Sequence, residues 1–168
     1  MNTLRFIDRL LYKIEVVLLV ALLGAMLGLA FWQVVLRNVF STGMVWADTV
    51  VRHLVMWLGF VGGALATADE RQINIDALTK LIPQRARHTV AVVTNAFAAT
   101  VCYFMAHSAW TFMLDERTSG GELVLSIPTW VALSILPAGY VVIAFHFFVR
   151  MIENVAAVFG KPAPEKPA

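Results

Sequence analysis

Charged residues divide the chain into four long apolar stretches. No Asp, Glu, Lys or Arg occurs in residues 16–36, 53–68, 88–114 or 123–149. About 20 residues of helix, rising about 1.5 Å each, cross a hydrocarbon core about 30 Å thick. The pattern therefore predicts an all-α membrane protein with transmembrane helices over about residues 14–37, 49–68, 88–114 and 123–149. Pro137, inside the last of these helices, is predicted to bend it.

The segments outside the four helices are amphipathic or polar. Within residues 74–82, Asn74 can cap a short helix whose apolar side chains share one face, which predicts an interfacial helix on the membrane surface. An ordinary amphipathic loop is the alternative. Residues 156–168 are rich in proline and polar groups and are expected to form a disordered cytoplasmic tail. Residues 1–155 then make up one transmembrane domain.

The distribution of basic residues predicts the orientation. Cytoplasmic loops of membrane proteins carry the excess of Lys and Arg. With four spans, one side of the membrane receives ten basic residues: Arg5, Arg9, Lys13, Arg71, Lys80, Arg85, Arg87, Arg150, Lys161 and Lys166. The other side receives Arg37, Arg52 and Arg117. Both termini are therefore predicted to be cytoplasmic.

Composition supports membrane insertion and excludes several classes of protein. Of the 168 residues, 60% are hydrophobic and 14% are charged, against roughly 45–50% and about 25% in soluble domains. One small globule cannot hide this much apolar surface, so the lipid bilayer is an expected partner. A net charge of +2 argues against nucleic-acid binding, and a single cysteine, Cys102, excludes an internal disulfide.

The uncharged spans argue against a stand-alone transporter. Ion-coupled carriers commonly hold Asp, Glu, Lys or Arg within the membrane, where each is kept for function. The polar side chains within the charge-free stretches are not acidic or strongly basic, which disfavours a proton-coupled pump. Sodium binding by carbonyl and hydroxyl oxygens is less strongly disfavoured. A third class, a small four-helix exporter, is suggested only by Glu15 at the start of the first helix. We expect Glu15 to pair with Lys13 at the membrane surface instead.

Two helices contain glycines at the spacing of small residues in helix contacts. Gly24 and Gly28 lie about midway through the first helix, and Gly59 and Gly63 lie about midway through the second. Such pairs let helix backbones approach closely, so an antiparallel contact between them is one interpretation. Because glycine is common in membrane helices, coincidence is the other.

Four histidines point to a second function class. His53 and His107 fall in the outer half of the predicted bundle, and His88 and His146 fall in the inner half. Two pairs at matching depth would allow axial ligation of two haems, as in a small cytochrome b-like redox anchor. However, His53 and His88 each follow an arginine at a span boundary, which favours hydrated interfacial groups. We therefore expect neither a cofactor nor a metal site.

The predicted outer loop between the first two helices has the densest polar pattern. Arg37 ends the first helix, Trp46 precedes Asp48, and Asp48 and Arg52 are four residues apart. At that spacing two side chains on a helix can pair, although an exposed ion pair contributes less than about 1 kcal/mol. These groups are candidates for positioning the loop against a partner protein. The alternative is a plain turn that faces the lipid headgroups.

Six short segments follow one another along the chain at informative spacing. They are FWQVVLRNVF (31–40), WADTVVR (46–52), WLGFVGG (57–63), INID (73–76), IPTW (127–130) and PAG (137–139). Together they resemble the small membrane subunit of TRAP (tripartite ATP-independent periplasmic) transporters, the DctQ type. Two positions depart from the family pattern, because Thr49 replaces a common Glu and Gln72 replaces the usual His. The resemblance covers about residues 5–155.

The resemblance implies a partner-dependent role without enzymatic activity. In that family the small subunit pairs with a large permease subunit of the DctM type, which binds substrate and sodium. A periplasmic substrate-binding protein of the DctP type delivers an organic acid. The chain is thus expected to be a non-catalytic scaffold for the large subunit in the bacterial inner membrane. Its outer surface is a candidate for docking the binding protein.

Overall fold

The computed structural model describes residues 2–68, 84–124 and 127–158. Its helices are α1 (Asn2–Phe40), α2 (Val45–Ala68), α4 (Gln84–Ser119), α5 (Thr129–Leu133) and α6 (Ile135–Val158). Two short antiparallel strands, β1 (Glu122–Val124) and β2 (Ile127–Pro128), lie between α4 and α5. The predicted interfacial helix over residues 74–82 and the tail residues 159–168 lie outside the described residues.

Four helical segments are long and apolar enough to cross a membrane, which confirms the predicted all-α membrane protein. They are Leu10–Phe40, Trp46–Ala68, His88–Ser119 and Thr129–Ala156. Each is longer than the charge-free stretch that predicted it, because the helical backbone continues into polar flanks. The fourth span begins at Thr129 and not at residue 123 as predicted, because β1 and β2 occupy residues 122–124 and 127–128. α6 continues to Val158, so residues 156–158, which were expected in the tail, are helical. The orientation with cytoplasmic termini stays a prediction.

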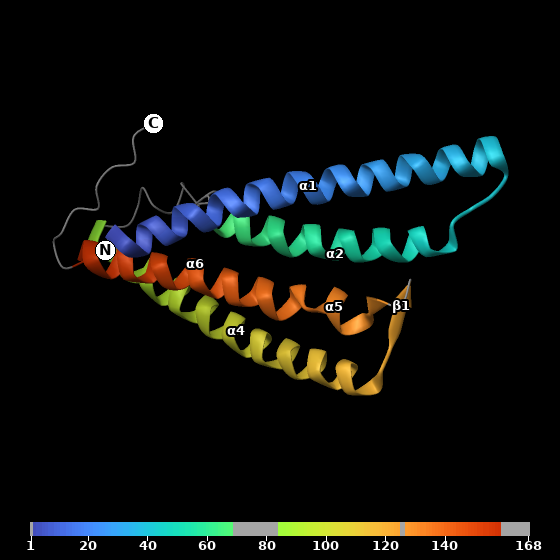
Figure 1. The fold of residues 1–168 in the computed structure, drawn as a ribbon. Coiled ribbons are helices and arrows are strands. Elements are labelled where there is room, and N and C mark those ends of the chain that lie inside the picture. Colours follow the sequence, from blue (N-terminus) through green and yellow to red (C-terminus); the bar gives the residue numbers. More distant parts are fainter. Residues whose placement is uncertain (1, 69–83, 125–126, 159–168) are drawn as a thin grey trace.

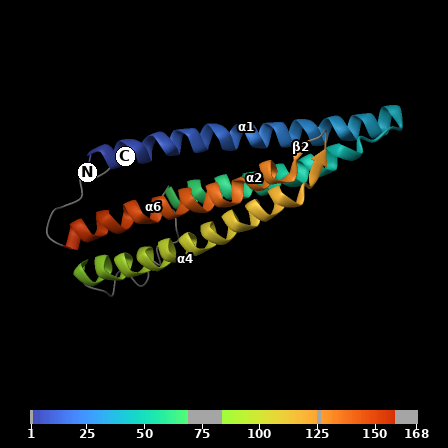
Figure 2. The same cartoon turned by 60° about the horizontal axis from the view of Figure 1, so that its bottom comes forward.

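The helices lie side by side in the order α1, α2, α6, α4 (Figures 1 and 2). α1 and α2 are antiparallel neighbours, and so are α4 and α6, as short connections require. α2 and α6 pack against each other in the centre and run in the same direction. α1 begins and α6 ends at the same end of the bundle (Figure 1). The central α2–α6 pair is therefore flanked by α1 on one side and α4 on the other.

The two long flanking helices each end at a residue with positive φ. Ser41 follows α1 with φ 52°, and Gly120 lies just after the end of α4 with φ 69°. A left-handed residue at this position satisfies the last carbonyl groups of a helix and turns the chain away from its axis. Gly120 adopts this conformation without a Cβ clash, whereas Ser41 accepts some strain.

The fourth span is broken between α5 and α6. Pro137 has no N–H to donate to the carbonyl one turn earlier, and its ring crowds that carbonyl, so the helix is interrupted at Ser134 and resumes at Ile135. Ser134 occupies the break and donates its hydroxyl to the carbonyl of Val131 at 2.7 Å. The Trp57 indole on α2 donates to the carbonyl of Ala132 at 2.8 Å. The interruption lies within one turn of Pro137, where the sequence predicts a bend, and the free carbonyl there provides α2 with a polar anchor on α5.

α2 and α6 approach each other closely at a glycine outside the predicted pairs. A Cβ atom on Gly139 would lie 2.6 Å from Cδ1 of Phe60, so the ring occupies the space that a side chain would need. The Phe60 ring also meets Tyr140 edge to face, with 5.1 Å between ring centroids. α2 and α6 are therefore held close by an aromatic ring set against a bare backbone.

The structure does not bring the predicted glycine pairs of α1 and α2 together. A Cβ atom on Gly24, Gly28 or Gly59 would meet nothing within 4 Å, and one on Gly63 would make an ordinary contact with Ile143 of α6. Where α1 does meet a glycine of α2, it does so with a side chain: Cδ1 of Leu19 lies 3.5 Å from a Cβ built on Gly62. The close antiparallel contact predicted for these glycines is therefore absent among the described residues.

Candidate functional site

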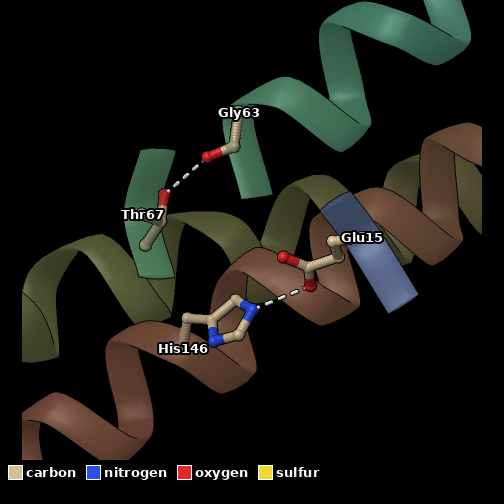
Figure 3. A network of polar contacts seen from close by, with 4 residues as sticks. All are labelled: Glu15, Gly63, Thr67 and His146. Carbon is tan, nitrogen blue, oxygen red and sulfur yellow. Dashed lines mark hydrogen bonds and ion pairs between the residues drawn. The ribbon is translucent and has the colours of Figure 1, made fainter. Parts of the chain in front are cut away.

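Three buried polar side chains come together from three helices. Glu15 of α1, Thr67 of α2 and His146 of α6 are 7%, 5% and 1% exposed, and they are the buried polar residues in the part of the chain that the structure describes. Figure 3 shows them close to one another. We call Glu15, Thr67 and His146 the polar cluster. In the polar cluster, α1, α2 and α6 each contribute a hydrogen-bonding side chain to the interior.

The polar cluster is built around a short contact between Glu15 and His146. Oε1 of Glu15 and Nε2 of His146 are 2.9 Å apart (Figure 3). The other carboxyl oxygen, Oε2, is buried and has no hydrogen-bond partner among the described residues. Thr67 donates its hydroxyl to the carbonyl of Gly63 at 2.9 Å, as a threonine in an apolar helix commonly does. The contact joins the first helix to the last.

This arrangement corrects the prediction for Glu15. Surface pairing with Lys13 is wrong, because Glu15 is buried and bonded to His146, while Lys13 is exposed. A buried acid is stable only when a hydrogen-bonding partner offsets its desolvation, and the imidazole supplies that partner. The first membrane-spanning segment begins at Leu10 and so contains Glu15. An ionisable group therefore lies inside the bundle, although the charge-free stretch starts one residue later.

The histidines do not form the arrangement expected of haem ligands. The Nδ1 atom of His88 lies 3.2 Å from Oδ1 of Asn154 on α6, and that of His53 lies 2.7 Å from the carbonyl of Thr49. His146 is engaged by Glu15, and His107 is exposed. The described residues contain no group of three metal-binding side chains. The redox-anchor alternative is not favoured.

The outer-loop residues lie at the opposite end of α1 from the polar cluster. Asp48, in the first turn of α2, accepts a hydrogen bond from Nε2 of Gln33 on α1 at 2.8 Å, in an exposed position. Its partner in the described structure is thus Gln33, not the predicted Arg52 or Arg37, and both arginines are exposed. A carboxylate in a first helical turn is also favoured by the helix dipole. Trp46 beside it is half-buried.

A second contact organises the same end of the bundle. The two short strands close the gap between α4 and α5, and the amide of Thr129 donates to the carbonyl of Gly121 at 2.9 Å. The guanidinium of Arg117 lies 5.5 Å from the centroid of the Trp130 ring, which is a cation–π contact. This hairpin fixes the start of the broken fourth span.

Comparison with known proteins identifies the family. The model of the DctQ component of tripartite ATP-independent periplasmic transporters matches residues 26–157. The chain belongs to this family. The matched residues include the outer-loop residues and His146, whereas Glu15 precedes them.

Individual DctQ relatives match over nearly the whole chain. A putative TRAP transporter small permease protein of Haemophilus influenzae is 23% identical, covering 93% of this chain and 96% of the relative. The sialic acid TRAP transporter small permease protein SiaQ of Vibrio cholerae is 24% identical, covering 94% and 90%. The C4-dicarboxylate TRAP transporter small permease protein DctQ of the same species is 22% identical, covering 80% and 68%.

The family and the four spans together define the class of this protein. It is a small permease subunit of the TRAP type, a transporter component and not an enzyme. It is a multi-pass protein of the bacterial inner membrane. The expected DctQ family membership is therefore confirmed.

Proposed function

We propose that this DctQ subunit is the non-transporting scaffold of a sodium-dependent TRAP transporter that imports an organic acid. Its main partner is a large permease subunit of the DctM type, which binds substrate and sodium. A periplasmic binding protein of the DctP type delivers the substrate. The outer end of this chain, with Arg37, Trp46, Asp48 and Arg52, helps to dock that binding protein.

The observation that carries this proposal is the way the bundle uses its polar groups. A translocation site needs polar groups that several helices enclose and leave available to a substrate or ion. In the described residues, the buried polar side chains are Glu15, Thr67 and His146. Glu15 and His146 bond to each other and Thr67 bonds to its own helix, which leaves one carboxyl oxygen of Glu15 without a partner there. No broken helix surrounds them, since the break between α5 and α6 is occupied by Trp57 and Ser134. This supports a scaffold whose transport path lies in a partner.

The exposed apolar surface supports the need for a partner. α1 and α4 each contact the rest of the chain along one side and expose large side chains along the other. Lipid covers part of this surface, and a large membrane subunit would cover the rest. The description of the family as one component of a tripartite transporter supports the same assembly.

The substrate class and the sodium dependence rest on likeness to relatives. Two relatives are named for sialic acid and for C4-dicarboxylates, which are both organic acids. Substrate specificity would lie in the large subunit and the binding protein. The exposed outer loop, which carries both charge signs and an indole, is a suitable surface for a soluble partner.

Reconstitution tests the proposed function. Proteoliposomes should contain this subunit alone, the large subunit alone or both, each with the binding protein outside and a panel of carboxylates. We expect sodium-gradient-driven uptake only where both membrane subunits are present, and none when potassium replaces sodium. Uptake by this subunit alone, or failure of the two subunits to co-purify in mild detergent, would overturn the proposal.

A further inference from the structure

α4 presents an unusual face to the outside of the bundle. Its buried residues Ala106, Ala109 and Met113 lie on the side that packs against α6. Successive residues of a helix are turned by about 100°, so the opposite side carries Thr100, Phe104, His107 and Thr111. All four of these side chains are exposed. We call these four residues the α4 outer face.

Within the α4 outer face, the threonines and the histidine differ in how their polar atoms are satisfied. The hydroxyl of Thr100 donates to the carbonyl of Ala96 at 2.8 Å, and that of Thr111 donates to the carbonyl of His107 at 3.1 Å. A threonine bonded in this way is tolerated against lipid. The His107 imidazole has no hydrogen bond to any other described residue. It lies about two turns before the predicted outer end of the span.

An imidazole at this depth does not suit a lipid surface. It always carries at least one N–H donor, and hydrocarbon offers nothing to accept it. Ionisable residues within membrane helices therefore face protein or water-filled cavities. His107 does not face the interior of this chain, so a second protein is the remaining source of a partner group.

α1, the other flanking helix, shows the contrast. Its exposed side chains over residues 16–31 are apolar, and they include Val17, Val20, Leu27 and Phe31. Residues 16–32 contain no polar side chain other than the Trp32 indole. Such a surface is compatible with contact to lipid chains. The two flanks thus have different chemistry, because α1 is apolar over residues 16–31, whereas the α4 outer face carries a histidine and two threonines.

We propose that the α4 outer face docks against the large permease subunit, with His107 hydrogen-bonded to a polar group of a partner helix, and that α1 faces lipid. This proposal rests on the proposed function and adds the direction in which the subunit is attached. Thr100 and Thr111 are small enough to let a partner helix approach closely, and Phe104 supplies apolar contact area beside the imidazole. The partner helix must therefore carry a hydrogen-bonding side chain, or a free carbonyl, at the depth of His107.

Photo-crosslinking in cells that express all three components tests the direction of attachment. A benzophenone amino acid is placed at Phe104 of α4 or, as a matched control, at Phe31 of α1. Both residues are exposed phenylalanines, at 61% and 70%. We expect an adduct of this chain with the large subunit from Phe104 and none from Phe31. An adduct only from Phe31, an adduct of two copies of this chain, or reaction of Phe104 with lipid alone would overturn the proposal.

Substitution of His107 tests the proposed hydrogen bond. His107→Leu should reduce the large subunit recovered with this chain by about fivefold, the effect of losing one hydrogen bond. His107→Gln, which keeps a donor and an acceptor, should recover most of it, and the control Phe31→Leu should change nothing. Equal recovery from His107→Leu and the wild type would overturn the role of His107. If the wild-type chain recovers no large subunit, the proposed function fails and this proposal fails with it.

Discussion

α1 makes two polar contacts of almost equal length in very different surroundings. Near its start, Glu15 meets His146 of α6 at 2.9 Å, and near its end, Gln33 meets Asp48 of α2 at 2.8 Å. The first pair is buried, with side chains 9% and 1% exposed, whereas the second is exposed. Distance alone would rank the two contacts as equal. Their surroundings decide what each contributes.

Burial makes the Glu15 contact hard to replace. If one partner of a buried pair is removed, the other is left in the interior without a hydrogen bond and also without water. At the exposed pair, water or lipid headgroups take the place of a lost partner, so the loss is small. The polar cluster is therefore expected to determine where α1 lies, and the Gln33–Asp48 contact to adjust the outer loop.

Removing one partner of the polar cluster should have the largest effect. Glu15→Ala or His146→Ala is expected to lower the free energy of unfolding by about 2–3 kcal/mol, because each leaves a buried polar group unsatisfied. The measurement is unfolding by SDS in mixed micelles, followed by circular dichroism. The double substitution Glu15→Ala with His146→Ala should lose less than the sum of the two single substitutions. Additive losses would show that the two side chains do not depend on each other.

A side chain at Gly139 should have the next largest effect, and it tests packing without polar groups. Gly139→Val is expected to lower stability by about 2 kcal/mol, because its Cβ would lie 2.6 Å from the Phe60 ring. The same unfolding measurement applies. Gly24→Val is the matched control, since its Cβ meets nothing within 4 Å. Equal losses at both positions would contradict the close approach of α2 and α6.

The Trp57 anchor should have an intermediate effect. Trp57→Phe keeps the aromatic ring but removes the donor to the carbonyl of Ala132, at an expected cost of about 1 kcal/mol. Trp110→Phe is the control, because Trp110 is exposed at 54%. Thermal unfolding of both variants in detergent provides the comparison. If both variants lose the same stability, the loss comes from replacing any tryptophan by phenylalanine and not from this hydrogen bond.

The exposed outer-loop contact should have the smallest effect on stability and a separate effect on function. Asp48→Ala is expected to change the free energy of unfolding by less than about 0.5 kcal/mol. Charge reversal, Asp48→Lys, should leave the fold intact and reduce uptake by the assembled transporter, because this surface is proposed to face the binding protein. Uptake is measured with the binding protein at limiting concentration. Unchanged uptake would remove Asp48 from the proposed docking surface.

The sequence predicts the spans well because their cause is local. Four stretches without charged residues are long enough to cross a bilayer, and the structure has four spanning helices at those places. Pro137 predicts a bend for an equally local reason, since the ring and the missing N–H act within one turn. The lateral order of the helices has no local cause. It depends on features such as the fit of Phe60 against Gly139, which spacing alone does not reveal.

The contacts of the candidate site could not be predicted from the sequence for the same reason. Glu15 and His146 are separated by 131 residues, so no helical periodicity links them. Their common depth, near the predicted cytoplasmic end of the first and last helices, is the signal that could have suggested a contact. At the outer loop, spacing allowed Asp48 to pair with Arg52, but a neighbouring helix supplied Gln33 instead. Exposed arginines have little reason to leave water for a carboxylate.

The most direct test of the scaffold is uptake by a transporter whose small subunit carries both Glu15→Leu and His146→Leu. The account predicts that the complex assembles and takes up substrate at close to the wild-type rate with the same sodium dependence, because this buried pair holds helices together and lies off the transport path. A complex that assembles in normal yield but takes up no substrate would place the pair in translocation and contradict the account.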